Sequence, residues 1–247
     1  MRYAMIPGGM IQRRLFLIAA SSFALSACGG NLLGPPAESP FIYPVHPTFP
    51  TGSGEKVGWA LSILRPDMMG GLDTERMVLH QADGTMDFYA RANYPDRLGM
   101  VVQQVLLDGF ESSGRISAVA PEQAALHADY NLVTEVKDFS AHYAQADGIP
   151  SVTVSITAKL TTAHGRAIVS DFSTSQTLNA SANSAGAVAQ ALQQALGTAV
   201  TQIVNWALTA PMPSTQQPMA TASPGKPAEQ LLHDATRGAN RARGDSP

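Results

Sequence analysis

Residues 151–160 alternate strictly between apolar side chains and hydroxyl or charged ones, and this pattern limits the fold more than any other feature of the chain. A period of two belongs to a β-strand with one buried and one wet face. Segments 130–143 and 167–178 are the neighbouring strand candidates, and Asp-Gly and His-Gly turns join them to the central segment. We therefore predict an antiparallel meander of three strands whose outer face is polar.

The first strand of this meander changes phase along its length. Its apolar side chains occupy even positions from Tyr130 to Val136 and odd positions from Phe139 onward. One extra residue near Lys137 or Asp138 would restore the alternation, so a β-bulge is predicted there.

Shorter strands are expected on the amino-terminal side of the meander. Residues 76–80 and 85–94 are typical of strands, and Asp83-Gly84 between them is a good two-residue hairpin turn. Residues 61–64 and 116–119 are further short candidates.

Two helices complete the predicted fold. The first lies between Pro95, which suits a first helical turn, and Gly114, which suits a carboxyl cap. The second runs from about Ser184 to Leu208, with an apolar stripe at helical spacing and glutamines on the other side. The predicted fold class is α+β: a largely antiparallel sheet with two helices packed on one face, a two-layer sandwich.

Charge and cysteine content exclude several classes of protein. The chain has 16 Lys and Arg against 19 Asp and Glu, and the basic residues form no block. A nucleic-acid binder needs concentrated positive charge, so no nucleic-acid partner is expected. The only cysteine, Cys28, permits no internal disulfide and no cysteine metal cluster.

The position of that cysteine is informative. Two arginines precede a short apolar run at residues 15–25, and the small residues Ser26 and Ala27 stand directly before Cys28. The run would rise only about 16 Å as a helix, roughly half of a bilayer core, so it is predicted to be an export signal and not a spanning helix. Either the first methionine or Met10 can start this signal.

The four residues 25–28, Leu-Ser-Ala-Cys, resemble the bacterial lipobox. That resemblance implies cleavage between Ala27 and Cys28, a diacylglyceryl group on the thiol and an acyl group, such as palmitate, on the new amino terminus. Several acyl chains anchor a protein firmly, whereas one holds only marginally. The alternative is an ordinary secretory signal that is cut after Ala27. Gly29 stands where an aspartate would hold many lipoproteins at the inner membrane, so the outer membrane, facing the periplasm, is the expected location.

Composition divides the rest of the chain. Residues 28–58 are rich in proline, glycine and serine and are predicted to be a lipidated tether. Residues 59–210 form the predicted α+β domain. Residues 211–247 show no apolar period and are predicted to be a disordered tail. With residues 1–27 as signal peptide, the chain has one folded domain.

Three short motifs, and the helix between the last two, carry a resemblance to a known family. Residues 71–79 read Gly-Leu-Asp-Thr-Glu-Arg-Met-Val-Leu, residues 94–98 read Tyr-Pro-Asp-Arg-Leu, and residues 113–116 read Ser-Gly-Arg-Ile. Over residues 60–208 the chain resembles the ABC-type transport auxiliary lipoproteins, the PqiC/YmbA group. Tyr94 stands where that family usually has tryptophan.

The resemblance implies a function. Members of this family work beside MCE-domain proteins and an ABC transporter that move phospholipids or other hydrophobic molecules between two membranes. The chain is then expected to dock such an assembly at the outer membrane through its sheet edge or the wet face of the meander. A lipoprotein that assists assembly of a lipopolysaccharide or secretion pore is the first alternative, and a lipid-binding carrier with its own pocket is the second. A homo-oligomer is left open.

Nothing in the sequence predicts catalysis. The chain has no Gly-x-Ser-x-Gly elbow, no phosphate-binding glycine loop and no His-Glu-x-x-His pair. The histidines are scattered through predicted loops and strand ends, and the acidic residues of the domain suit turns, caps or wet faces. A non-enzymatic protein without metal or cofactor, apart from the lipid on Cys28, is expected. The residues that could in principle serve catalysis or metal binding are histidines 46, 80, 127, 142, 164 and 233, and Asp73, Glu75, Asp87 and Asp138.

Overall fold

The computed structural model describes residues 38–52, 54–124, 127–164 and 167–211. The predicted signal, the lipidation site at Cys28 and nearly all of the predicted tail lie outside these residues. The described elements, in chain order, are β1 (Phe41–Ile42), β2 (Val57–Ile63), β3 (Asp67–Met68), β4 (Arg76–His80), β5 (Met86–Asn93), α2 (Leu98–Ser113), β6 (Ile116–Pro121), the 3-10 helix η1 (Glu122–Ala124), β7 (Tyr130–His142), β8 (Ser151–Thr162), β9 (Ile168–Asn179) and α3 (Ala185–Thr209).

The predicted meander is confirmed. β7 pairs with β8 along its whole length in the antiparallel sense, and β8 pairs with β9 in the same way. The register of β7 and β8 shifts between Val136 and Asp138, where the change of phase predicted a bulge. The apolar rows of β7 and β8 face the core, and the hydroxyl rows face outward.

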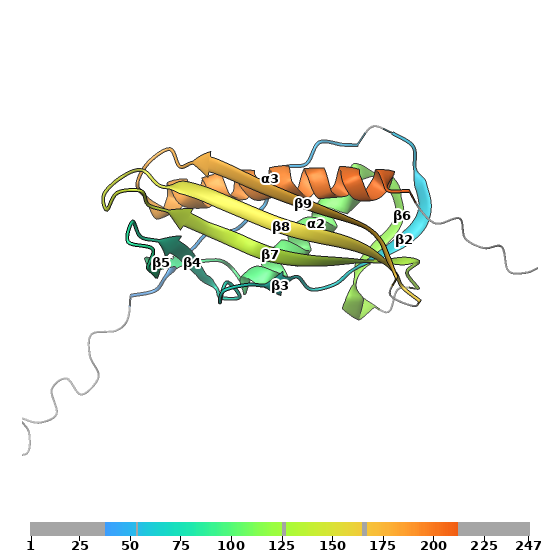
Figure 1. Cartoon of the computed structure of the whole chain (residues 1–247), viewed down its shortest axis with the longest axis horizontal. Coiled ribbons are helices and arrows are strands. Elements are labelled where there is room, and N and C mark those ends of the chain that lie inside the picture. The colour runs from blue at the N-terminus through green and yellow to red at the C-terminus, as the bar shows by residue number, and fades with distance from the viewer. Residues whose placement is uncertain (1–37, 53, 125–126, 165–166, 212–247) are drawn as a thin grey trace, which may run out of the picture.

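The opposite edge of β7 is shared by three short parallel strands. β2 pairs with residues 130–132, β3 with residues 135–136 and β4 with residues 141–142. β6 extends the sheet beyond β2, whereas β5 and then β1 extend it beyond β4. The sheet therefore forks at β7, with β2 and β6 at one end of the molecule and β4 and β5 at the other (Figure 1). The α+β class holds, with more parallel pairing than the sequence indicated.

Both helices cover one face of this sheet. α3 runs along the long axis over β8 and β9, and α2 lies over β2 and β6 (Figure 1). The hydroxyl of Ser184 accepts a hydrogen bond from the backbone of Ala187 and caps α3, whereas Gly114, with φ of 60°, ends α2. A Cβ added to Gly109 would lie 2.6 Å from a methyl of Val200, so this glycine allows the close approach of the two helices.

Residues 41–56, which we call the strap, cross the outer side of the helix layer. Val45 is buried, and the backbone N–H of His46 donates to the side-chain oxygen of Gln193 at 3.0 Å. A Cβ on Gly197 would lie 2.8 Å from the Cβ of Pro47, so α3 is shaped to receive the strap. Proline-rich composition rules out regular structure but not packing. This part of the predicted tether therefore belongs to the folded domain, which begins near residue 41 and not at residue 59.

Candidate docking site

The loop between β2 and β4 fills the gap where the sheet forks. Only β3 pairs there with β7, so the loop needs other contacts to hold its shape. Leu72 is buried in the core, and the side-chain amide of Gln103 on α2 donates to the carbonyl oxygen of Ile63 at 2.9 Å. Residues 71–75 of the first recognised motif lie in this loop, near the start of α2, and residues 76–79 belong to β4.

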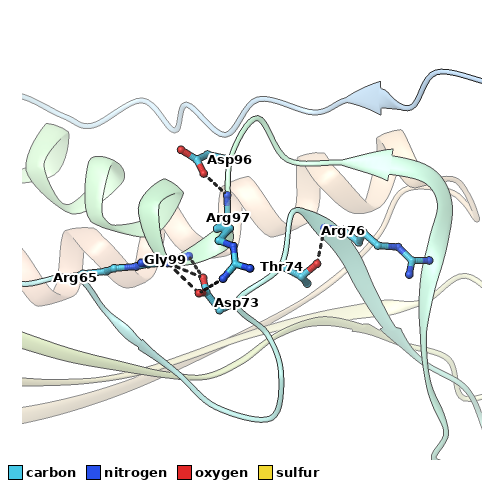
Figure 2. A network of polar contacts seen from close by, with 7 residues as sticks. All are labelled: Arg65, Asp73, Thr74, Arg76, Asp96, Arg97 and Gly99. Atoms are coloured by element: carbon cyan, nitrogen blue, oxygen red, sulfur yellow. Dashed lines mark hydrogen bonds and ion pairs between the residues drawn. The ribbon is translucent and has the colours of Figure 1, made fainter.

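Asp73 joins three segments at this point. Its carboxylate accepts hydrogen bonds from Arg65 at 2.9 and 3.2 Å and from Arg97 at 3.2 Å. It also accepts one from the backbone N–H of Gly99 at 3.3 Å. Figure 2 shows both arginines pointing at the same carboxylate from opposite sides, while Arg76 points away. We call Arg65, Asp73, Arg97 and Gly99 the Asp73 clasp.

The clasp caps α2 from a distance. The residue at the N-cap position of α2, Arg97, makes no side-chain capping bond, so the first N–H groups of the helix need another acceptor. Asp73 supplies one for Gly99, and the carbonyl oxygen of Thr74 accepts from the N–H of Leu98 at 3.1 Å. A carboxylate at a helix amino terminus is also favoured by the helix dipole. The motif residues therefore fix where α2 begins.

The clasp leaves its two guanidinium groups partly exposed. They share the carboxylate of Asp73, and the carboxylate of Asp96 accepts from the backbone N–H of Arg97 beside them (Figure 2). The side chain of Arg97 is 61% exposed, and that of Arg65 is 39% exposed. Such a site can accept a carboxylate or phosphate from a partner, because guanidinium groups bind both in a forked geometry.

Tyr94 lies between the hairpin and the clasp. Its ring is buried and meets Phe139 edge-on, with centroids 5.8 Å apart. Its backbone N–H donates to the carbonyl oxygen of Glu75, but its hydroxyl has no hydrogen-bond partner within the described part of the chain. Burial raises the pKa of Tyr94 far above its ordinary value. This position accommodates a large aromatic side chain, and the hydroxyl of Tyr94 adds no stabilising hydrogen bond there.

A second polar cluster lies on the outer face of the sheet, and sequence reasoning missed it. His80 and His142 stack with ring centroids 4.9 Å apart, because β4 pairs in parallel with the end of β7. Asp138 and Ser140 contact Nε2 of His142 at 2.9 and 3.1 Å. A Ser-His-Asp triad needs serine and carboxylate on different ring nitrogens, and Ser140 is fully buried. The arrangement therefore holds strands together and is not a catalytic triad.

Metal-binding clusters are absent from the described residues, since no group of three or more His, Cys, Asp or Glu within them could hold a metal ion. No helix among the same residues is long and apolar enough to cross a membrane. The remaining acidic residues weighed from the sequence, Glu75 and Asp87, are exposed.

Comparison with known proteins identifies the class. Residues 43–204 match the family model of the ABC-type transport auxiliary lipoprotein component. The match runs from the strap to the last turns of α3, so it spans nearly the whole described domain. The chain belongs to this family, and it is therefore an auxiliary lipoprotein of ABC-type transport.

Solved structures share the fold. Protein XCC0632 from Xanthomonas campestris, of family DUF330, is 27% identical with a TM-score of 0.61, over 68% of this chain and 94% of that chain. An uncharacterized protein is 16% identical with a TM-score of 0.54, over 68% and 98% of the two chains. The PelC dodecamer from Paraburkholderia phytofirmans is more distant, at 12% identity and a TM-score of 0.39 over 66% and 96%. No curated protein matches the sequence.

Proposed function

We propose that this protein is a non-catalytic, lipid-anchored component that docks an MCE/ABC-type transport system for phospholipids or other hydrophobic molecules at the outer membrane. The family match over residues 43–204 carries the proposal, because it covers the strap, the clasp and both helices. The family description names an auxiliary transport lipoprotein, and the proposal adds the MCE partner, the lipid cargo and the membrane.

The packed strap limits how far the domain can stand from an anchor at Cys28. The first described strand begins at Phe41, only 13 positions later. A fully extended chain of that length spans at most about 45 Å. The domain then works close to the membrane surface, as expected for a component that holds a transport assembly against it.

We propose that the Asp73 clasp contacts the partner. It combines an exposed guanidinium with a rigid setting at the start of α2, where the helix and the loop brace each other. Rigid, pre-positioned charged groups set register and association rate at interfaces. An acidic surface of the MCE assembly would complement this site.

A photo-crosslinking experiment tests the proposal. A photoreactive residue replaces Met100, which is 38% exposed and follows Gly99 on α2, and its control replaces Ile149, 61% exposed in the loop between β7 and β8. After irradiation of cells, we expect Met100 and not Ile149 to capture an MCE-domain protein or a transporter subunit. Capture of an outer-membrane β-barrel would favour the pore-assembly alternative, and capture of neither would overturn the proposal.

Charge substitutions separate docking from folding. Arg97→Gln removes the exposed guanidinium but leaves the pair of Arg65 and Asp73, so the domain should fold and capture of the partner should fall several-fold. Lys159→Gln, which removes an exposed cation in β8, is the control and should leave capture unchanged. Equal loss in both variants would assign the effect to general charge.

A carrier role fits the described cavities less well. Two of them, of about 230 and 440 Å³, open beside the strap. Their walls include the polar side chains of Thr201, Gln193 and Asn205. Lipid chains need a largely apolar wall. Phospholipid that co-purifies with the Cys28→Ser protein would revive the carrier alternative.

A further inference from the structure

Within the described part of the chain, the outer strand β9 is an open edge of the sheet. This strand of 12 residues pairs there only with β8. The other outer strands are protected against pairing with a further strand. β1 has only two residues and follows Pro40, and β6 ends at Pro121. Natural proteins protect edge strands with prolines, lysines or bulges, because unpaired backbone groups invite another strand. Residues 170–179 of β9 contain none of these devices.

The backbone groups on this edge can be identified. The N–H of Ala180 donates to the carbonyl oxygen of Pro150, so even-numbered residues near it face β8. Successive residues of a strand point their N–H and C=O groups to opposite sides, so the odd-numbered residues present theirs at the open edge. The close hydroxyl pair of Thr153 and Thr177, at 3.2 Å, agrees, because side chains approach most closely at non-hydrogen-bonded pairs.

The sequence of β9 is chemically symmetric about Ser175. Residues at equal distances before and after Ser175 form pairs of similar chemistry. The first pair joins a hydroxyl and an amide, the second two hydroxyls, the third two apolar side chains, and the fourth an aspartate and an asparagine. In order outward from Ser175 these pairs are Thr174 and Gln176, Ser173 and Thr177, Phe172 and Leu178, and Asp171 and Asn179. A strand with this pattern complements itself when it is turned end for end.

We propose that two copies of the chain pair through β9, antiparallel, about a two-fold axis at Ser175. The odd-numbered residues then exchange about ten backbone hydrogen bonds, and the two sheets become one. Phe172 of one copy lies opposite Leu178 of the other on the helix side. Both side chains are only partly buried in the single chain, so the pairing covers apolar surface as well.

The charge in β9 selects this register. Asp171, its only charged residue, lies opposite Asn179 of the second copy and can accept a hydrogen bond from the amide. A register two residues away would set Phe172 against a glutamine or an alanine. This self-pairing does not depend on the proposed transport function.

Cysteine crosslinking tests the axis. In an antiparallel hydrogen-bonded pair the Cα atoms lie about 5.5 Å apart, within disulfide reach. Ser175→Cys in the full-length lipidated protein, in detergent with a mild oxidant, should therefore form a covalent dimer. Ser173→Cys has the same strand, face and exposure, but its two copies would lie about 14 Å apart, too far for a disulfide. The parent protein, which retains Cys28, is the background control.

An experiment that mixes two cysteine variants is decisive. Ser173→Cys and Thr177→Cys proteins should each stay uncrosslinked alone and should form a mixed disulfide together. Equal crosslinking of Ser173→Cys and Ser175→Cys, no crosslinking of either, or a crosslink from Ser175→Cys to a different protein would each overturn the proposal.

A second measurement does not depend on cysteine chemistry. Ser175→Lys brings two ammonium groups together on the axis, so sedimentation should show at least a tenfold weaker dimer. Ser155→Lys is the matched control, because Ser155 lies opposite Ser175 on β8, one strand away from the edge. An unchanged dimer in Ser175→Lys, or equal weakening in both variants, would refute the pairing.

Discussion

Removal of the Asp73 carboxylate is the sharpest test of how the domain is held together. Asp73→Ala removes the distant cap of α2, worth about 1 kcal/mol, and two partly exposed ion pairs, each worth roughly 0.2–1 kcal/mol after solvent screening. The free energy of unfolding should fall by about 2 kcal/mol. Asp73→Asn keeps an oxygen that accepts from Gly99, so its cost should be only about 1 kcal/mol.

Urea denaturation in low and high salt separates these contributions. In 1 M salt the Debye length is about 3 Å, so wild type and Asp73→Asn should converge, whereas Asp73→Ala should keep about half of its deficit, the part due to the lost cap. Hydrogen exchange at the amide of Gly99 should accelerate in Asp73→Ala before other amides of α2. The control is Asp67→Ala in β3, an exposed carboxylate without an ion pair among the described residues. The reasoning fails if Asp73→Ala costs no more than this control, or if the alanine and asparagine variants cost the same.

Three further predictions follow from buried or tightly packed positions and from the anchor. Tyr94→Phe should stabilise the domain by about 1 kcal/mol in urea denaturation, because the buried hydroxyl has no partner in the described structure. Burial raises the pKa of Tyr94, so the folded state favours its neutral form, and the wild type should lose stability as pH rises past about 10. The loss should be smaller in Tyr94→Phe. Parallel curves of unfolding free energy against pH for the two proteins would contradict this. Gly109→Ala should lower the free energy of unfolding by about 1–3 kcal/mol, because the new Cβ would meet Val200. Gly186→Ala, in the open first turn of α3, should raise it by up to about 1 kcal/mol. Equal melting temperatures of the two variants would refute the argument that Gly109 allows the helices to cross closely. Cys28→Ser should abolish acyl labelling and release the protein from the membrane fraction, and full transport activity by this variant would show that the anchor is dispensable.

Features that depend on neighbouring residues could be predicted from the sequence. The alternation in β7 and β8, the bulge after Val136 and the extent of α3 all follow from patterns within a few residues. The Asp83-Gly84 hairpin was predicted for the same reason. The two strands that it joins pair as expected, but the loop between them has three residues, 82–84, and not two.

Features that depend on distant partners could not be predicted. Periodicity tells which face of a strand is buried but not which strand lies beside it, so the parallel pairing of β2, β3 and β4 with β7 was missed. The stack of His80 and His142 was missed with it, since it results from that pairing. The clasp joins Asp73 to Arg97 and Gly99 across the hairpin, and only the folded chain shows that one carboxylate serves both.

The route of the strap has a mechanical consequence. A pull on the chain at residue 38 would act first on the strap, because its contacts, from β1 through Pro47 to Gly52, come first along the chain. Tension from a membrane anchor would therefore strip the cover from α3 and α2 while β7, β8 and β9 stayed intact. The strap would then yield first under load, and the helix surface would be exposed only when the assembly is stretched.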